Sequence, residues 1–576
     1  MGSGDSSTAP QSRQIPLSIV GVVALALVLR LIHLSSAVVS PLTFQLGADE
    51  DYYFRFGRAV ASGIGQSSAE FTFMDPGYGY LVGVLFKLFG PSIFAIYALQ
   101  CLLDSFTTLA IVVLGQQLKK PRAGLIGGIL YCVNSSALMF CCSLLKEIWV
   151  AAFMTWWVVI ALHLLRSERK LAWLGFGIFC GIAVAFRSTL ILFAVVALGL
   201  PWISGPILQV RPAQRWVRCL LCAIGLLIAL SPCSIRNYEA YQGLSPLPHN
   251  GGIVLHQTYN SQNPDSSMWI PGFVNYLHPS EIWRGYAAEA ERRMGRELTP
   301  PEVDRYWRSQ ALEFIRQNPG QALGAVGRKA LKFFASTDIP VNRSLKEEGL
   351  FSPLIAYLPN SAPWLLGLGL AGLAWLGLED RRFVVVAVPL VIALLTSAFF
   401  LAEDRFRFHA FAILAFCSGV WIDATLRRIQ GRRFKAAAIS GGAVAALLGT
   451  SFALGAAITP PPLHWDQVVW GYIKMGRPKE AQATADSVAR EEPDSAPILE
   501  ALAYLAVQRR DYAGAADAYE HALRVRPRSD QAHYNLAKVY MALNKPSDAL
   551  IQAKMALDLK FDPDYKNLVD ALRNAQ

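Results

Sequence analysis

Charged side chains are scarce in this 576-residue sequence. Asp, Glu, Lys and Arg make up 16% of it, whereas hydrophobic residues make up 53%. This composition, with a mean hydropathy of +0.33, excludes an ordinary soluble protein. The formal charge of +11 does not indicate nucleic-acid binding, because the basic residues gather in short runs between apolar segments. The sequence therefore predicts an integral membrane protein without a nucleic-acid partner.

Cysteine is missing from every polar part of the chain. All nine cysteines lie in or beside apolar segments, and none falls in segment 237–360 or after residue 417. This distribution excludes a disulfide framework and a zinc site of the usual Cys spacing. A cleavable signal peptide is not expected either, since the first apolar run is too long and lacks a cleavage site. Residues 1–14 before it are predicted to be a disordered tail.

Long apolar runs, in contrast, are abundant. A spanning helix needs about 20 mostly apolar residues. Eleven segments meet this description, near 15–35, 92–117, 121–141, 147–166, 171–187, 188–204, 216–235, 361–379, 383–402, 406–425 and 435–458. The shorter apolar run 77–90 is read as a re-entrant or interfacial helix. The predicted membrane domain is thus an all-α bundle over residues 15–458.

The basic runs between these segments predict the orientation of the bundle. They lie at 119–122, 166–170, 211–218, 381–382 and 427–435, and all fall on one face if the spans alternate. Lys and Arg favour cytoplasmic loops, so this face and the N-terminus are predicted to be cytoplasmic. The first loop (36–91), the long segment 237–360 and the C-terminal region are then extracytoplasmic. Segment 237–360 is long enough to be a small folded domain.

A soluble, Ala-rich region follows the Pro-rich hinge at 459–463. Ala481, Ala515 and Ala549 recur every 34 residues, and Pro493 and Pro527 keep the same interval. This period is typical of tetratricopeptide helix pairs, which stack into an α-solenoid. Residues 464–576 are therefore predicted to form three repeats, at 464–497, 498–531 and 532–565, and a capping helix at 564–575.

Three carboxylates stand together in the first loop, at Asp49, Glu50 and Asp51. An Asp-x-Asp pair can hold a divalent metal against a nucleotide sugar, and clustered carboxylates suit hard cations. The predicted topology argues against a nucleotide donor, because such sugars are made in the cytosol and these residues face the other side. Acids also favour a helix N-terminus, which is the simplest alternative for one of the three.

Five cations are predicted at the outer ends of spans, against the orientation trend: Lys146, Arg187, Arg236, Arg405 and Arg407. Arg makes bidentate contacts with phosphate, so these residues are candidates for a phosphate site. The alternative is that they reach lipid headgroups or pair with Glu147, Glu403 and Asp404. Asp104, in mid-span, is expected to face the interior of the bundle as a structural residue.

An ordered set of short motifs between residues 17 and 425 resembles the GT-C glycosyltransferases of the protein O-mannosyltransferase and aminoarabinose-transferase kind. The motifs are Asp49-Glu50 with Tyr53, Asp75-Pro76-Gly77-Tyr78, Glu147, Gly181 to Arg187, Ser231-Pro232 with Ile235-Arg236-Asn237, Asn250-Gly251-Gly252, Asn318-Pro319 before Lys329, and Arg405-Phe406-Arg407. Two departures weaken a match to the aminoarabinose enzymes. They carry Arg-Tyr where this chain has Tyr52-Tyr53, and a Lys before two prolines where it has Asp75-Pro76-Gly77.

The resemblance implies an inverting transfer of a sugar, such as a hexose, from a polyprenyl-phosphate donor to an extracytoplasmic acceptor. Asp49 is the expected base, with Glu50 as a second catalytic candidate, and desolvation is expected to raise the pKa of Asp49. No cofactor is certain, but Asp49 and Asp51 are candidate ligands of a divalent metal. The five cations would bind the donor phosphate.

The repeats favour a protein acceptor or an assembly partner, because tetratricopeptide stacks present a groove for peptides. Transfer to protein Ser or Thr is therefore the first hypothesis. Transfer to a lipid-linked glycan or envelope polysaccharide is the second, and a non-catalytic membrane scaffold is the third.

Overall fold

The computed structural model describes residues 17–64, 69–207, 211–263, 269–274, 278–459 and 463–574. Over these ranges the chain forms 29 α-helices and two short 3-10 helices, and no strand. The predicted all-α class is thereby confirmed. The predicted tail 1–14 and residues 460–462 of the predicted hinge lie outside the described residues.

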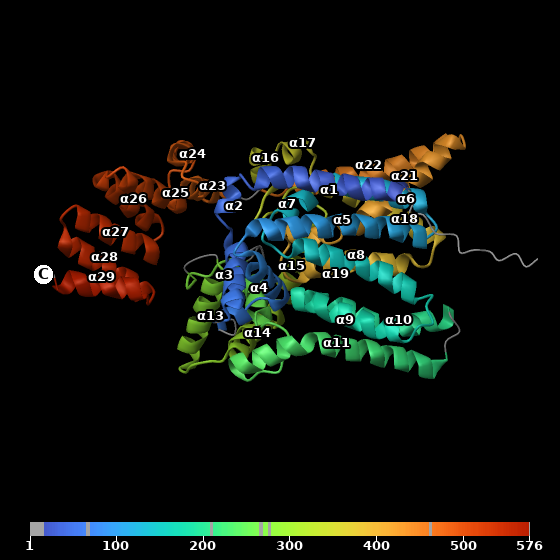
Figure 1. The fold of residues 1–576 in the computed structure, drawn as a ribbon, viewed down its shortest axis with the longest axis horizontal. Helices are drawn as coiled ribbons and strands as arrows, with labels where there is room; N and C mark the ends of the chain where they lie inside the picture. Colours follow the sequence, from blue (N-terminus) through green and yellow to red (C-terminus); the bar gives the residue numbers. More distant parts are fainter. Residues whose placement is uncertain are drawn as a thin grey trace, which may run out of the picture.

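Apolar helices lying side by side make up the larger part of the molecule (Figure 1). They are α1 (Leu17–Ala37), α5 (Ile93–Gln117), α6 (Pro121–Cys132), α7 (Ser135–Cys141), α8 (Glu147–Leu164), α9 (Leu171–Phe186), α10 (Ile191–Ile207), α11 (Pro212–Tyr241), α18 (Ser361–Glu379), α19 (Phe383–Phe399), α21 (Phe411–Gln430) and α22 (Phe434–Ala456). Six of the described helices are long and apolar enough to cross a membrane, or seven if α6 and α7 form one span. The chain is an integral membrane protein, and the count of eleven spans stays a prediction.

The pair α6 and α7 departs from the single straight span expected over 121–141. The two helices meet at an angle of 59°. Asn134 stands at the break, where its side chain accepts a hydrogen bond from the backbone N–H of Ala137 at 3.0 Å. Asn at this position is a strong N-cap, so a second helix starts here rather than the first continuing.

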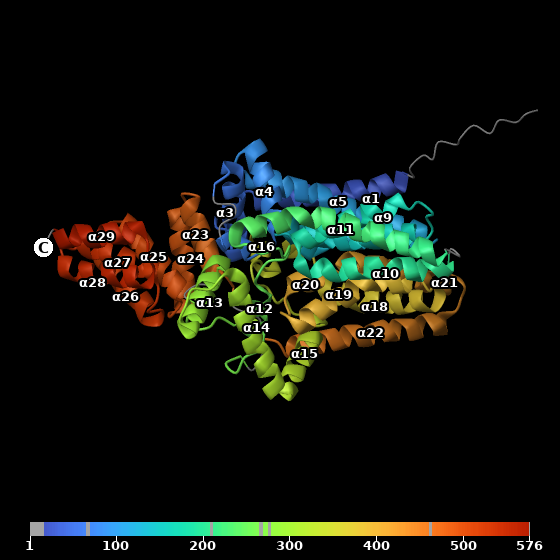
Figure 2. The same cartoon turned by 90° about the horizontal axis from the view of Figure 1, so that it is seen from below.

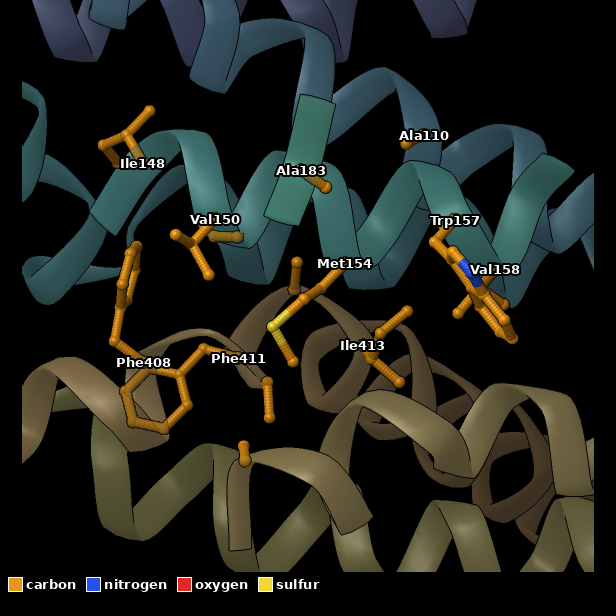
Figure 3. Packing of buried hydrophobic residues seen from close by; sticks show 14 of the residues in the cluster. Ala110, Ile148, Val150, Met154, Trp157, Val158, Ala183, Phe408, Phe411 and Ile413 are labelled. Carbon is orange, nitrogen blue, oxygen red and sulfur yellow. The ribbon is translucent and has the colours of Figure 1, made fainter. Parts of the chain in front are cut away.

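The core of the bundle packs α8 against α21. Figure 3 shows Met154 of α8 extending into the space between α8 and α21, where Ile413 of α21 also lies, with Phe408 and Phe411 beside each other on the left of the view. Two helices approach each other closely at Gly372 of α18, where an added Cβ would meet the carbonyl oxygen of Cys417 of α21 at 1.8 Å. Only glycine fits at such a crossing, since any side chain would separate the helices.

One ion pair lies inside the bundle, between Arg30 of α1 and Asp104 of α5. Both side chains are fully buried, with Arg30 Nη2 at 2.6 Å from Asp104 Oδ2. Tyr131 donates a hydrogen bond to the other carboxylate oxygen at 2.7 Å. The expectation that Asp104 faces the interior is therefore confirmed. Arg30 and Tyr131 stabilise its negative charge, which lipid cannot do.

The basic runs gather at one end of the bundle. Lys120 pairs with Glu379, Arg382 donates to the carbonyl of Gln117 at 3.0 Å, and Arg428 lies 3.8 Å over the ring of Trp375. Three connectors far apart in sequence thus contact each other. The opposite end carries the helices of the polar segments (Figures 1 and 2).

Shorter helices cover that opposite end; most come from the polar segments, and one is the apolar run 77–90. They are α2 (Pro41–Phe44), α3 (Ala48–Ser62), η1 (Ala69–Thr72), α4 (Pro76–Phe89), η2 (Ser188–Leu190), α12 (Gly251–Thr258), α13 (Pro279–Met294), α14 (Pro300–Gln317), α15 (Pro319–Phe333), α16 (Leu345–Phe351), α17 (Pro353–Tyr357) and α20 (Asp404–Phe408). A second apolar cluster around Tyr286 and Trp307 holds α12, α13 and α14 together. Segment 237–360 therefore has a small core of its own.

The C-terminal region consists of three helix pairs and a final helix. The pairs are α23 (Trp465–Lys474) with α24 (Pro478–Glu491), α25 (Ala496–Gln508) with α26 (Tyr512–Val525), and α27 (Asp530–Ala542) with α28 (Pro546–Leu559), followed by α29 (Pro563–Asn574). Ala481, Ala515 and Ala549 are fully buried between the helices, as their regular spacing predicted. The stack extends away from the bundle (Figure 1).

Candidate functional site

The carboxylates of the first loop occupy the first turn of α3. Glu50 is fully buried and closes a capping box, since the backbone N–H of Gly47 donates to its Oε2 at 3.0 Å. Its Oε1 accepts from the backbone N–H of Leu144 at 2.9 Å and from Arg343 at 3.0 Å. These contacts anchor the loop to the bundle. Glu50 thus supplies the helix-capping role that the sequence left open, and its catalytic role stays a prediction.

Asp49, one residue earlier, faces the other way. Its Oδ2 accepts from Arg405 Nη1 at 2.6 Å and from Asn342 Nδ2 at 2.8 Å. Its side chain remains 15% exposed, so a ligand can reach it. Asp49 is therefore fixed by two hydrogen bonds and is still accessible to a ligand.

The pKa of Asp49 differs from the sequence expectation. Burial by itself raises this pKa, but the charge and hydrogen bond of Arg405, the hydrogen bond of Asn342 and the charge of Lys146 outweigh it. The pKa of the carboxyl accordingly lies below its ordinary value, and the expected rise is wrong. Sequence reasoning placed Asp49 at a desolvated boundary but had no means of pairing it with a cation 356 residues away.

Arg405 links Asp49 to further buried charges. Its Nε donates to Glu403 Oε2 at 2.5 Å, and its guanidinium lies 5.4 Å from the ring of Phe406. Arg187 also lies near this ring. Its guanidinium is 4.5 Å over the ring of Phe406 and 3.2 Å from Glu147. Phe406 is thus flanked by two arginines.

Lys146 completes the group, at the start of α8. It pairs with Asp75, whose other oxygen accepts from the backbone N–H of Ser188 at 2.9 Å. We call the resulting set the charged cluster: Asp49, Asp75, Lys146, Glu147, Arg187, Glu403 and Arg405. It lies where α3, α4, α8, η2 and α20 meet. Three of the five predicted cations are in it.

The cations of the charged cluster are paired with carboxylates, as the alternative to a phosphate site predicted. Arg187 with Glu147 and Arg405 with Glu403 are two of the expected pairs. Polar atoms without a hydrogen-bond partner nevertheless remain buried here in the described structure, on Tyr53, Glu147, Glu403 and His409. Buried polar atoms normally have partners, so these atoms indicate a place for a polar ligand or water.

Arg236 and Arg407 are engaged elsewhere. Arg236 donates to the side-chain oxygen of Asn237 and to the carbonyl of Phe71. Arg407 donates to the carbonyls of Ala335 and Thr337 and pairs with Asp404, the third expected pair. Their contacts hold loops in place, and a role for either in phosphate binding stays a prediction.

Asp51, the second candidate metal ligand, does not share a partner with Asp49. It pairs with Arg55 at 2.9 Å and lies 3.4 Å from His278. Within the described ranges no group of three or more His, Cys, Asp or Glu side chains is placed to hold a metal ion. The donor atoms present thus do not fit a ready-made divalent site, and the metal role of Asp49 and Asp51 stays a prediction.

Two cavities reach this region from different sides. The larger, of about 1130 Å³, is lined mainly by apolar side chains of η2, α10, α12, α14, α15 and α19 and extends to Ser188 and Thr189, next to Arg187. We call it the apolar cavity. The smaller, of about 810 Å³, is lined by Asp49, Asp51, Asn342 and Arg405 together with residues of α13 and of the first repeats. We call it the polar pocket.

Sequence reasoning missed several residues of the site. Asn342 and Arg343 lie in a loop without periodicity, and nothing local marks them as partners of Asp49 and Glu50. Asp75 was noted in a motif but not as a site residue, although an Asp directly before Pro76 at a helix start is a signal of a positioned carboxylate. Glu403 was expected only as a neutralising partner.

Comparison with known proteins gives matches in both parts of the chain. Residues 75–235 match the dolichyl-phosphate-mannose-protein mannosyltransferase family. Residues 469–520 and 506–572 match tetratricopeptide repeats. A search of curated proteins gives no match.

The search of solved structures gives matches of low identity. The oligosaccharyltransferase of Archaeoglobus fulgidus in the apo form has 14% identity, a TM-score of 0.43, and coverage of 78% of this chain and 57% of that chain. ArnT from Cupriavidus metallidurans bound to undecaprenyl phosphate has 16% identity, a TM-score of 0.28, and coverage of 71% and 79% respectively. The chain thus spans little more than half the length of the oligosaccharyltransferase.

The family match confirms the resemblance found in the sequence and supports a membrane glycosyltransferase. The 34-residue period is likewise confirmed as tetratricopeptide repeats. The chain therefore combines a segment that is similar to the dolichyl-phosphate-mannose-protein mannosyltransferase family, over residues 75–235, with C-terminal tetratricopeptide repeats.

Proposed function

We propose that the chain transfers a sugar from a polyprenyl-phosphate donor to Ser or Thr hydroxyls of proteins on the outer side of the membrane. The observation that carries this proposal is the position of the charged cluster. Its Asp75 accepts a hydrogen bond from Ser188 at the end of the apolar cavity, whereas its Asp49 and Arg405 line the polar pocket. A lipid-linked donor and a water-soluble acceptor can therefore approach the charged cluster from two cavities.

The apolar cavity suits the lipid part of the donor. Leu192, Leu323 and Phe399 line it and are exposed, as expected of side chains that meet lipid. Its polar end at Ser188 adjoins Arg187, and the backbone N–H of Ser188 connects through Asp75 to Lys146. A phosphate at this end would be close to two cations of the charged cluster, which would stabilise the charge that develops when the phosphate leaves.

Asp49 is the proposed base. It is ionised at neutral pH because its pKa is held below the ordinary value. The carboxylate takes the proton of the acceptor hydroxyl, the hydroxyl oxygen bonds to the anomeric carbon, and the bond from this carbon to the phosphate oxygen breaks. The hydroxyl attacks the face of the carbon opposite the phosphate and the bonding electrons leave with the lipid phosphate, so the configuration at this carbon inverts.

Donor binding would also activate the base. Arg405 shares its donors between Asp49 and Glu403. A phosphate that attracts Arg405 weakens its hold on Asp49, and burial then raises the pKa of Asp49 toward a value better suited to proton transfer. Glu403 can give up Arg405, because burial raises the pKa of this carboxyl and favours its neutral form.

The orientation belongs to the same proposal. The basic runs meet at the end of the bundle opposite the charged cluster. By the preference of Lys and Arg for the cytoplasmic side, the charged cluster, segment 237–360 and the repeats are extracytoplasmic.

The test is Asp49→Asn in the full-length protein, with transfer of labelled sugar from polyprenyl-phosphate donors to Ser- and Thr-containing peptides as the readout. Loss of a general base lowers rates by about 10² to 10⁴, so we expect a fall of that size in kcat. The matched control is Asp423→Asn, a buried carboxylate that is paired with Arg427 and lines the same small pocket as Arg122 of the first basic run. We expect it to keep wild-type transfer.

Three outcomes would count against parts of the proposal. Wild-type rates in Asp49→Asn would remove Asp49 as the base. Transfer by the wild type to a lipid-linked glycan or polysaccharide but to no peptide would replace the protein acceptor. Failure of the wild type to turn over any polyprenyl-phosphate sugar would favour a scaffold.

A further inference from the structure

The polar pocket is lined by residues of two regions that the sequence predicts to be separate domains, the membrane domain and the tetratricopeptide repeats. Its floor comes from the first loop, with Gly47, Asp49 and Asp51. Part of its wall comes from the first repeats, with Gln467 and Lys474 of α23 as well as Pro497 of α25. The repeats thus stand beside the proposed base itself, and not only at a distance from the bundle.

The first repeat is seated firmly against the loop. Gly471 of α23 packs on Pro41, where an added Cβ would meet the Pro41 carbonyl oxygen at 2.1 Å. His464 donates its backbone N–H to Glu347 and has its Nδ1 at 3.1 Å from the same carboxylate. A further bond joins Arg528 to the carbonyl of Gly272 at 3.1 Å. The wall of the polar pocket is therefore a fixed part of the site.

We propose that helix α23 of the first repeat is part of the acceptor site, where Gln467 and Lys474 contact an extended polypeptide on one side of the reacting hydroxyl. The inference rests on the proposed function. It assigns to the repeats a direct contact with the acceptor next to Asp49, distinct from capture of a partner by the rest of the stack.

The chemistry of the polar pocket fits an extended peptide. Its walls alternate aliphatic side chains, such as Ile270, Ile282 and Val341, with the amide side chains of Gln45 and Gln467. Amides offer both a donor and an acceptor, which is what a peptide backbone requires. The Oε1 atom of Gln467 is buried and has no hydrogen-bond partner in the described part of the chain. A backbone N–H of the acceptor would satisfy it.

Lys474 supplies a charge that can select among peptides. It is exposed, and its charge acts on Asp51 across the polar pocket together with that of Arg55. A side chain of the acceptor that lies between Lys474 and Asp51 would meet one charge of each sign. The balance of these two charges should therefore influence which residues next to the hydroxyl are accepted.

The test uses two peptides that differ only in having Glu or Lys beside a single Thr, with a polyprenyl-phosphate sugar as donor. Lys474→Glu should change the ratio of kcat/KM for the two peptides about threefold or more in favour of the Lys peptide, a size expected of one exposed charge pair. The matched control is Lys554→Glu, an exposed lysine of α28 that does not line the polar pocket.

The outcomes separate this inference from the function on which it rests. Transfer by the wild type with the same ratio in Lys474→Glu and Lys554→Glu would overturn the inference alone. No transfer to either peptide by the wild type would overturn the protein acceptor and this inference with it.

A second measurement needs no variant. A peptide with a photoreactive group beside its Thr should cross-link in the wild-type protein to residues 464–474, and mass spectrometry would locate the bond. Cross-links confined to the membrane domain, at residues before 459, would overturn the inference.

Discussion

The apolar cavity and the polar pocket differ in almost every property, although both extend to the charged cluster: the polar pocket is lined by Asp49 and Arg405, and the apolar cavity ends at Ser188, which donates to Asp75. The apolar cavity is larger, lined mainly by apolar side chains that include exposed Leu and Phe, and bounded by α10, α15 and α19. The polar pocket is lined by carboxylates, amides and cations from α3, α20 and α23. The difference shows how one cluster can serve two reactants that dissolve in different phases.

The same comparison explains why the cluster contains both signs. A site that only bound phosphate would have unpaired cations, whereas here four carboxylates face three cations. Arg405 stands at the boundary, because it lines the polar pocket with Asp49 while Glu403 holds it from the bundle side. Three substitutions test this division between a donor side and an acceptor side.

The largest effect is expected from Arg405→Lys. A lysine is a point charge that cannot bond to Asp49 and Glu403 in the forked geometry of the guanidinium. We expect kcat for sugar transfer to fall about 10- to 100-fold. Because the pKa of Asp49 is held low by Arg405, the weaker contact should also move the acidic limb of the pH profile of kcat to higher pH.

The matched control for this prediction is Arg407→Lys, the same change two residues later. Arg407 is bonded to the carbonyls of Ala335 and Thr337. We expect a lower Tm and an unmoved acidic limb. An acidic limb that shifts equally in both variants would show that Arg405 has no special influence on Asp49.

A smaller effect is expected on the donor side alone, from Leu323→Asp in α15. Leu323 lines the apolar cavity and is 74% exposed. Loss of its apolar contact, worth about 1.5 kcal/mol for a partly covered leucine, corresponds to about a tenfold increase in the KM for the donor. The KM for the peptide should not change.

Leu331→Asp is the control, since Leu331 is an exposed leucine of the same helix that does not line the apolar cavity. It should leave both KM values at the wild-type level. A rise of the peptide KM in Leu323→Asp would contradict the assignment of this cavity to the donor.

The smallest effect concerns the seam between the repeats and the loop domain, on the acceptor side. The hydrogen bond to Glu347 raises the pKa of His464 above its ordinary value of about 6.5, although burial opposes this. Because the pKa of His464 is higher in the folded than in the unfolded state, its protonation stabilises the folded state below the unfolded-state pKa. This stabilisation is lost as the pH rises through the folded-state pKa. Docking of the repeats should accordingly weaken from pH 6 to pH 8.5.

Limited proteolysis near residues 459–463 measures this weakening, which should be less than about 1 kcal/mol for a partly exposed pair. In Glu347→Gln the rate of cleavage should lose most of its dependence on pH. Cleavage that accelerates with pH in this variant as much as in the wild type would assign the effect to another group.

Much of the fold could be predicted because its signals are local. Apolar runs and a 34-residue period are read within a single segment, and the matching helices and repeats are present. The bend between α6 and α7 was missed, although Asn134 followed by two serines is a helix-start signal that could have revealed it.

The site could be predicted only in part, because its contacts join distant segments. Nothing in the sequence distinguishes Arg405 from Arg407 as a candidate site residue. On a helix, however, side chains two positions apart do not face the same way. Only Arg405 reaches Asp49, while Arg407 binds loop carbonyls. Asn342, which holds Asp49 from 293 residues away, belongs to no motif and could not have been found.

The contact of Gly471 with Pro41 has a consequence for how a long acceptor would be read. Because no side chain fits between them, the first repeat has no room to rock against the first loop. A polypeptide gripped by α27 and α28 would then reach Asp49 only after a set number of its own residues. The stack would thus set the distance along the polypeptide between the bound segment and the modified hydroxyl. A substitution at Gly471 that tilts the stack should change which hydroxyl along the polypeptide receives the sugar.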